Sequence, residues 1–266
     1  MKIIAKAYEE PFGDPSILPC TYLFSHIKDK NDFIITGDSC DAIFGNADMY
    51  RVCSLPNRLN LKFKRFNNRK CHKRYYRDYS EMIQVNILNR FDYSDKLLGV
   101  KGVCKNVEKV DSDVRNSLLF DLCNTVTEKF KVKTTALANY YNINNYTPYF
   151  DIDILQKTFE IPLRKIRRKG KGKYIFRKVL YNNIPEKYYA EYKKKGFGIP
   201  MKKWCQDVFF KEAVKLSDKE FIEKQNLFKY DELTKLFDDF KNEPDYNKSI
   251  VIWNYYVFQN WYKENF

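Results

Sequence analysis

The sequence predicts a mainly helical protein that keeps a short α/β edge near its start. A helix at residues 16–28 leads into an apolar strand at 32–36 and a Gly-Asp turn, which together form the second half of a βαβ unit. No convincing further strand follows Ala42, and helical patterns continue to residue 263. With 44% hydrophobic and 17% aromatic residues, the chain can bury a substantial core.

The first elements are short. Residues 1–8 begin inside a helical or strand-like element, and residues 9–16 (EEPFGDPS) form a loop because two prolines and a glycine forbid a regular element. Ser16 is placed to cap the helix that follows. The strand at 32–36 is a continuous apolar run, which indicates a fully buried strand.

Helices dominate the remaining chain. They are expected at residues 79–93, 112–131, 151–160, 173–183, 200–215, 219–224, 230–241 and 247–263. In the last of them four apolar residues recur near helical spacing and predict a stripe that faces the core: Ile250, Trp253, Val257 and Trp261. We therefore expect a partial α/β segment at residues 1–50 and a mainly helical remainder at 51–266.

The amino-acid composition indicates which partners, metals and cellular locations to expect. The 48 Lys and Arg residues against 34 Asp and Glu give a formal charge of +14, which suits an anionic partner but equally fits a lysine-rich solvated surface. Seven scattered cysteines without a CxxC pair and two histidines offer few zinc ligands. No signal peptide or apolar run of about 20 residues is recognisable, so we expect a soluble, cytoplasmic protein without a membrane partner.

Two acids follow the predicted strand. Asp38 would lie at the carboxyl end of the strand, where open α/β sheets form their ligand crevice. Asp41 would fall at the start of the next helical turn. Carboxylates at such a rim hold Mg²⁺ against phosphate oxygens. The alternative is that both acids only cap the following helix.

Two glycine-containing basic stretches are further candidates. In residues 167–180 (RRKGKGKYIFRKVL) a basic loop enters a helix, and Lys173 and Arg177 share one face at its first turn. A cation opposes the helix dipole there, which suggests that the residues meet a phosphate; the alternative, and by itself the commoner case, is a solvated basic loop. Residues 193–204 (KKKGFGIPMKKW) form a lid or a simple turn, and Lys194 is a candidate contact for phosphate or lid closure, as is Arg177.

One basic segment supports a different function. Residues 62–77 contain eight Lys or Arg and no acid, interleaved with Phe and Tyr. Such a mixture provides both stacking and phosphate contacts for RNA. A basic, aromatic, helical RNA-binding protein is therefore the alternative to an enzyme.

Five segments occur in a familiar order: EEPFGDPS, TGDSCDAIFG, TPYFD, GKGKYIFRKVL and KKGFGIPxxxW. Together they resemble the synthetase domain of glutamine-dependent asparagine synthetases, a family that includes β-lactam synthetase and the lasso-peptide cyclases. The resemblance spans about residues 9–263 and implies a remnant of an adenine nucleotide α-hydrolase-like nucleotide-binding sheet. It also implies an ATP-dependent carbon-nitrogen ligase that forms an acyl-adenylate with Mg²⁺, which ammonia or an amine then converts to an amide, by default aspartate to asparagine.

The resemblance assigns a role to each matching residue. Thr36 and Gly37 match the Ser-Gly pair whose backbone contacts ATP. Asp38 matches the acid that assists formation and aminolysis of the intermediate, and Asp41 matches a ligand of the Mg²⁺-pyrophosphate. Lys173 matches the lysine that meets the negative charge growing at the α-phosphate, which is transition-state stabilisation by a preorganised cation.

The sequence also departs from the family pattern. The pyrophosphate loop Ser-Gly-Gly-x-Asp-Ser and the glutaminase domain occur nowhere in these residues. Ala42 replaces the usual Glu after Asp41, and Tyr146 replaces an arginine ahead of Pro148. We therefore expect the lone chain to be incomplete: either a second polypeptide supplies the loop and the glutaminase domain, or the chain is an inactive fragment.

Overall fold

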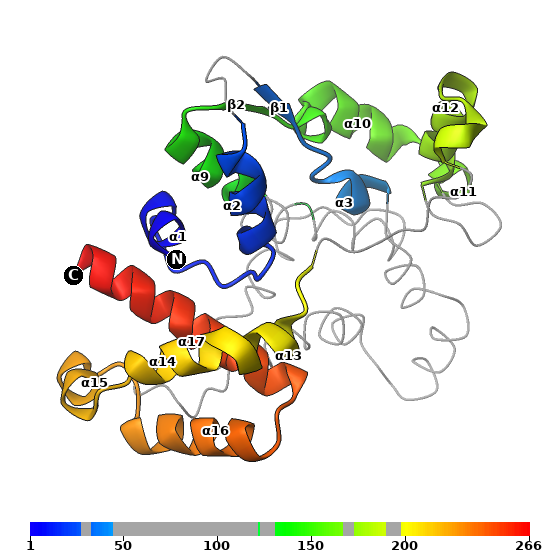
Figure 1. Ribbon diagram of the computed structural model, residues 1–266. Coiled ribbons are helices and arrows are strands. Elements are labelled where there is room, and N and C mark those ends of the chain that lie inside the picture. Colours follow the sequence, from blue (N-terminus) through cyan, green and yellow to red (C-terminus); the bar gives the residue numbers. More distant parts are fainter. Residues whose placement is uncertain (28–32, 45–121, 123–130, 167–172, 190–197) are drawn as a thin grey trace, which may run out of the picture.

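The computed structural model describes residues 1–27, 33–44, 122, 131–166, 173–189 and 198–266 (Figure 1). The described chain is mostly helical and contains a two-stranded parallel sheet, which confirms the predicted fold class. The predicted helix at 79–93, most of that at 112–131 and the basic segment 62–77 lie outside the described residues.

The first half of the described chain contains the sheet and seven α-helices with two short 3₁₀ turns. Its elements are α1 (Lys2–Ala7), α2 (Ile17–Ser25), β1 (Phe33–Ile35), α3 (Cys40–Phe44), α9 (Val132–Tyr141), β2 (Asn144–Tyr146), η3 (Pro148–Phe150), α10 (Ile152–Glu160), α11 (Leu163–Ile166), α12 (Tyr174–Asn183) and η4 (Glu186–Tyr188).

The second half is a helical bundle. A π-helical turn interrupts its first helix, which otherwise runs over the predicted range 200–215. The elements of this half are α13 (Met201–Trp204), η5 (Cys205–Phe209), α14 (Phe210–Lys215), α15 (Lys219–Gln225), α16 (Tyr230–Asn242) and α17 (Tyr246–Asn265).

The helices of the bundle begin and end where local chemistry requires it. The Asp218 carboxylate accepts a hydrogen bond from the backbone N–H of Phe221 at 2.9 Å and so caps α15, which stops at Asn226 in the left-handed region. Asp245 caps α17 in the same way through the N–H of Lys248 at 2.8 Å. In α16 the buried residues are Leu233, Leu236, Phe237 and Phe240, whose spacing defines one face.

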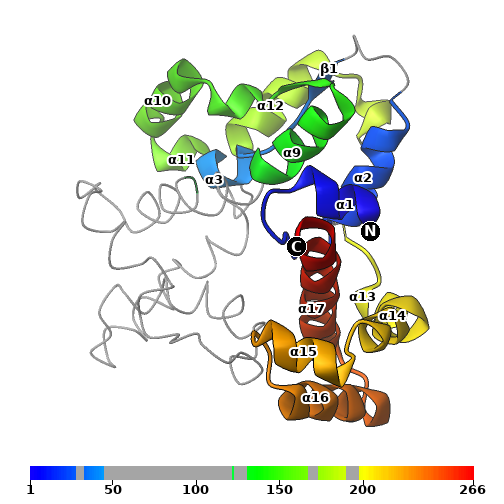
Figure 2. The same ribbon diagram turned by 90° about the vertical axis from the view of Figure 1, so that its left-hand side faces the viewer.

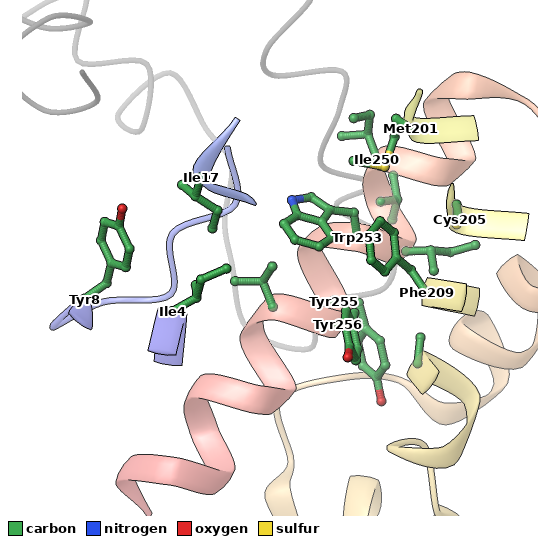
Figure 3. Close-up of a cluster of buried hydrophobic side chains, with 14 of the residues drawn as sticks. Ile4, Tyr8, Ile17, Met201, Cys205, Phe209, Ile250, Trp253, Tyr255 and Tyr256 are labelled. Carbon is green, nitrogen blue, oxygen red and sulfur yellow. The ribbon is translucent and has the colours of Figure 1, made fainter. Parts of the chain in front are cut away.

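The main core lies where α17 meets α1, α13 and α14 (Figure 3). Trp253 of α17 is fully buried, and its ring centroid lies 4.8 Å from that of Phe209. Ile4 and Tyr8, at the start of the chain, belong to the same core. The predicted apolar stripe of α17 is therefore confirmed as a core-facing surface.

The last helix also holds the 9–16 loop. The indole Nε1 of Trp253 donates a hydrogen bond to the carbonyl of Gly13 at 2.8 Å. A Cβ atom on Gly13 would collide with the amide oxygen of the Asn254 side chain, so any other residue at this position would force that side chain to move. Ser16 does not cap α2 with its side chain, contrary to the prediction, because its backbone is in the right-handed helical region instead of the extended conformation of a capping residue. Its Oγ accepts a hydrogen bond from Lys133 Nζ at 2.9 Å.

The sheet corrects two predictions. β2 pairs in parallel with β1, with Phe33 opposite Asn144 and Ile35 opposite Tyr146, so a strand does follow Ala42. β1 is not fully buried, because Phe33 and Ile35 are 59% and 64% exposed and only the face of Ile34 packs on the core. Figure 2 shows the sheet and α9–α12 on one side of α1 and α17, and α13–α16 on the other.

Candidate functional site

The candidate site begins where both strands end. The backbone N–H of Thr36 donates a hydrogen bond to the carbonyl of Tyr146 at 2.9 Å, and the hydroxyls of Thr36 and Thr147 lie 2.8 Å apart. These contacts extend the pairing of β1 and β2 by one residue and fix the course of the chain into Gly37 and Asp38. The carboxyl ends of the two parallel strands therefore form one rim.

Asp38 is held by a residue of α9. Thr134 is buried, and its Oγ1 donates a hydrogen bond to Asp38 Oδ2 at 3.1 Å. One carboxylate oxygen of Asp38 is thereby oriented by a hydroxyl from a distant part of the chain. Thr134 was not predicted as a site residue, because neither a helix over 132–141 nor its packing against the rim was expected.

Ser39 turns the chain from the rim into α3 in an unusual conformation. Its φ angle of 75° lies in the left-handed region, which disfavours any residue with a Cβ atom. Its hydroxyl is also buried, and no hydrogen-bond partner for it occurs among the described residues. The turn between the two predicted acids is therefore strained and imperfectly satisfied.

Asp41 and Lys173 are brought together. Lys173 Nζ lies 2.7 Å from Asp41 Oδ1, and the two side chains are 28% and 50% exposed. Lys173 precedes α12 with a φ of 56°, and the backbone N–H of Arg177 donates to its carbonyl at 3.0 Å. A pair this exposed contributes little to stability. Its significance is that it places a cation and a carboxylate beside the rim.

Cys40 and Tyr149 complete the cluster around this pair. Burial raises the pKa of the Cys40 thiol, although the neighbouring Lys173 ammonium and hydrogen bonds to Tyr149 and Lys173 oppose the change. Burial, together with the neighbouring thiol, raises the pKa of Tyr149 to about 12. Both groups are therefore neutral at pH 7, and the formal charges of the cluster come from Asp41 and Lys173.

A small apolar cluster fixes α3 against α12. Ile43, Phe44 and Ile166 are buried together, and the ring of Phe176 lies 4.5 Å from that of Phe44 and 5.4 Å from that of Tyr149, measured between centroids. Since Phe176 belongs to the first turn of α12, this packing sets the position of Lys173. The aromatic contacts were not anticipated from the sequence.

A buried cation ties the 9–16 loop to the same region. Lys133 Nζ lies 3.6 Å from Asp14 Oδ2, with both side chains about nine-tenths buried, and Tyr8 donates a hydrogen bond to the Lys133 carbonyl at 2.9 Å. Burial raises the pKa of Cys20 to about 11; Lys133 opposes the change, whereas Asp14 and Asp38 add to it. Cys20 of α2 therefore lies close enough to both Asp14 and Asp38 to feel their charges.

Of the other predicted residues, Arg177 lies exposed on α12, one turn beyond Lys173. Lys194 lies outside the described residues, as does the basic segment 62–77. Among the described helices none is long and apolar enough to cross a membrane.

The donor set at the rim suits a particular kind of metal site. In the described part of the chain, no group of three or more His, Cys, Asp or Glu side chains is arranged so that it could hold a metal ion. Mg²⁺ commonly takes one or two carboxylates and completes its shell with water and phosphate oxygens. The carboxylate of Asp41 is half exposed, so it could contribute one oxygen to Mg²⁺ and leave room for water and phosphate. Asp38, three residues earlier, is a second candidate carboxylate.

A comparison with known protein families shows which family the chain belongs to. Residues 1–263 match the family described as Asparagine synthase. Comparisons with curated proteins and with solved structures gave no match. Because the family match covers nearly the whole length, and because the geometry joins segments that carry the family's sequence pattern, the chain belongs to the asparagine synthase family.

Proposed function

We propose that this chain takes part in ATP-dependent amide-bond formation through an acyl-adenylate, with aspartate as the default carboxylate and ammonia or an amine as the acceptor. Asparagine synthase is a family of ATP-dependent ligases. The observation that carries the proposal is the 2.7 Å contact between Lys173 Nζ and Asp41 Oδ1, which unites two distant segments at the rim of the sheet.

Each charged residue has a proposed role. Lys173 supplies a cation where negative charge grows on the α-phosphate, and its partial burial strengthens that interaction. Asp41 would hold Mg²⁺, which screens the pyrophosphate oxygens. The backbone of Thr36 and Gly37 contacts ATP, and Asp38, oriented by Thr134, assists formation and aminolysis of the acyl-adenylate. Arg177 and Lys194 are proposed as additional phosphate or lid contacts.

We propose that the complete ATP site is formed by this chain together with a second polypeptide. The Ser-Gly-Gly-x-Asp-Ser sequence that cradles pyrophosphate in the family is not found in these 266 residues. A second polypeptide carrying that loop and the glutaminase domain would complete the site. Two departures from the family pattern lie next to this region, Ala42 in α3 and Tyr146 at the end of β2, and we propose that they alter which carboxylate is accepted.

ATP-pyrophosphate exchange tests the function. We expect background exchange for the chain alone and restored exchange when it is combined with the N-terminal synthetase segment of an intact asparagine synthetase. In the reconstituted mixture Lys173→Ala should lower exchange by at least about 100-fold. Lys178→Ala is the matched control, because it removes an exposed cation from the same helix. Equal exchange by the two variants would refute the role of Lys173.

A further inference from the structure

The two charged side chains that the candidate site brings together are bonded to each other. Lys173 Nζ lies 2.7 Å from Asp41 Oδ1, and the two side chains are 28% and 50% exposed. Asp41 belongs to the first turn of α3, whereas Lys173 directly precedes α12, far along the chain. Each charge at the rim therefore has a partner of opposite sign within the protein itself.

The backbone on both sides of this ion pair holds it in place. Ser39, two residues before Asp41, has a φ of 75°, and Lys173 itself has a φ of 56°. A residue with a Cβ atom disfavours this left-handed region, so it stays there only where the surrounding structure holds it. Packing of Phe176 against Phe44, with ring centroids 4.5 Å apart, supplies such support. The tertiary structure thus positions the two charges to meet.

The roles proposed for the two residues compete with this contact. Mg²⁺ takes carboxylate oxygens, and the second oxygen of Asp41 could still serve it. The metal ion and the Lys173 ammonium would then share one carboxylate, and the like charges would repel each other at that short distance. A phosphate group beside Lys173 would meet the Asp41 carboxylate in the same way. Each ligand alone is therefore opposed by the residue that the other ligand would neutralise.

The two ligands together remove this opposition. Mg²⁺ on Asp41 would cancel the charge that repels phosphate, and phosphate on Lys173 would cancel the charge that repels Mg²⁺. Lys173 also hydrogen-bonds the thiol of Cys40, so its ammonium keeps one contact at the site when it leaves Asp41. Coupling between two ligands is reciprocal: each must raise the affinity for the other by the same factor.

We propose that the Asp41–Lys173 ion pair is a resting contact that masks both binding groups, so that a divalent cation and a phosphate group bind cooperatively, each releasing the residue that holds the other. The class of ligand rests on the proposed function. The consequence is selectivity, because free Mg²⁺ and metal-free polyphosphate each bind poorly, whereas a polyphosphate that carries its metal ion neutralises both residues at once.

Calorimetric titration of the 266-residue chain tests the mask, with Mg²⁺ alone in one series and metal-free pyrophosphate plus a chelator in the other. Lys173→Met removes the masking cation and should raise the affinity for Mg²⁺ about three- to fivefold, the range expected for a pair this exposed. Asp41→Asn removes the masking anion and should raise the affinity for metal-free pyrophosphate by a similar factor. Because the pair contributes little to stability, both variants should melt like the wild type.

Variants of neighbouring charges are the matched controls. Lys178→Met removes an exposed cation from α12, and Asp153→Asn removes an exposed acid from α10, which packs against α3. Both should leave the two affinities within about twofold of the wild type, since salt screens exposed charges that are not in contact. Lys173→Arg keeps the masking charge and should bind Mg²⁺ as weakly as the wild type does.

The crossed effects decide the outcome. Tighter Mg²⁺ binding by Lys173→Met, together with tighter pyrophosphate binding by Asp41→Asn, supports the mask. Unchanged or weaker binding by either variant would overturn it, as would equal gains in the controls or no binding by any variant at millimolar ligand. Crossed effects without ATP-pyrophosphate exchange in the reconstituted mixture would contradict the proposed function and leave the mask in place, whereas exchange without crossed effects would do the reverse.

Discussion

The bundle and the sheet-and-site region are built differently. The bundle, formed by α1 and α13–α17, shares with α2 and α9 one large core in which Trp253, Phe240 and Ile252 are among the fully buried side chains. Among its described residues the sheet-and-site region, formed by β1, β2, α3 and α10–α12, buries small clusters around Ile43 and Ala42, and only Ile34 of β1 packs on the large core. It also exposes many large apolar side chains. The bundle contains most of the buried apolar core, and the other region contains the residues for which we propose a chemical role.

The difference has a physical consequence. Free energies of local opening are lowest where few apolar contacts are buried. Polar groups such as Lys173 and Asp41 can then be placed at the rim without the constraints of a dense core. The region that carries the candidate site should therefore open locally before the bundle unfolds.

The largest expected change in the free energy of unfolding comes from truncating a buried isoleucine to alanine in each region. Ile252 and Ile43 are both fully buried. We expect Ile252→Ala to lower the free energy of global unfolding by about 3 to 4 kcal/mol, because the dense bundle core cannot close the cavity. Ile43→Ala should lower it by about 2 kcal/mol or less and mainly speed hydrogen exchange in α3 and α12.

Urea unfolding and hydrogen exchange followed by mass spectrometry measure both effects. If Ile43→Ala lowers the global free energy as much as Ile252→Ala, the two regions form one cooperative unit and the comparison fails.

A smaller effect of opposite sign is expected at Ser39. Ser39→Gly should raise the free energy of unfolding by about 1 kcal/mol, because glycine tolerates a φ of 75° and the unsatisfied hydroxyl disappears. Ser39→Ala keeps the Cβ atom and removes only the hydroxyl, so it should stabilise less. Thermal unfolding of the three proteins should rank them Gly, Ala, Ser. Gly and Ala variants of equal stability would show that the left-handed backbone carries no strain.

The smallest effect concerns the cap of α17 in the bundle. Burial tends to raise the pKa of Asp245, but hydrogen bonds from the backbone and ammonium of Lys248 outweigh it and hold the pKa below its ordinary 3.8. A lowered folded-state pKa adds stability that is present above the unfolded value and is lost as pH falls through the folded one. Asp245→Asn keeps a capping oxygen and removes the charge.

The Asn variant should therefore be less stable than the wild type by under about 0.5 kcal/mol at pH 7. Urea midpoints measured from pH 7 to pH 3 should converge below pH 4. A difference that persists unchanged into acid would mean that the charge of Asp245 contributes nothing.

Sequence reasoning succeeded where the pattern is local. The helices α10, α12 and α14–α17 lie close to their predicted ranges, because amphipathic spacing reports which face is buried. It failed at β2, since Asn144-Asn145-Tyr146 has no strand-like composition and becomes a strand only by pairing with β1. It failed at α9, where Lys133 and Thr134 are buried on a helix that lacks an apolar stripe.

In the candidate site, too, local sequence patterns were predictable and tertiary contacts were not. Motif order identified Asp38, Asp41 and Lys173, whose side chains and backbone lie at or near one rim. Their supporting residues, Thr134 and Tyr149, are joined to them by tertiary contacts that no spacing encodes. Their proposed chemical roles stay predictions.

The hydrogen bonds from α17 to residues 8 and 13 have a consequence for folding during translation. Indole donors of this helix hold backbone carbonyls at Gly13 and, at 3.2 Å through Trp261, at Tyr8. The ribosome makes these two acceptors early and their donors late. The loop that carries these carbonyls can therefore reach its native conformation only after translation has passed residue 261. A premature stop before α17 would release a polypeptide in which the loop lacks both hydrogen-bond donors.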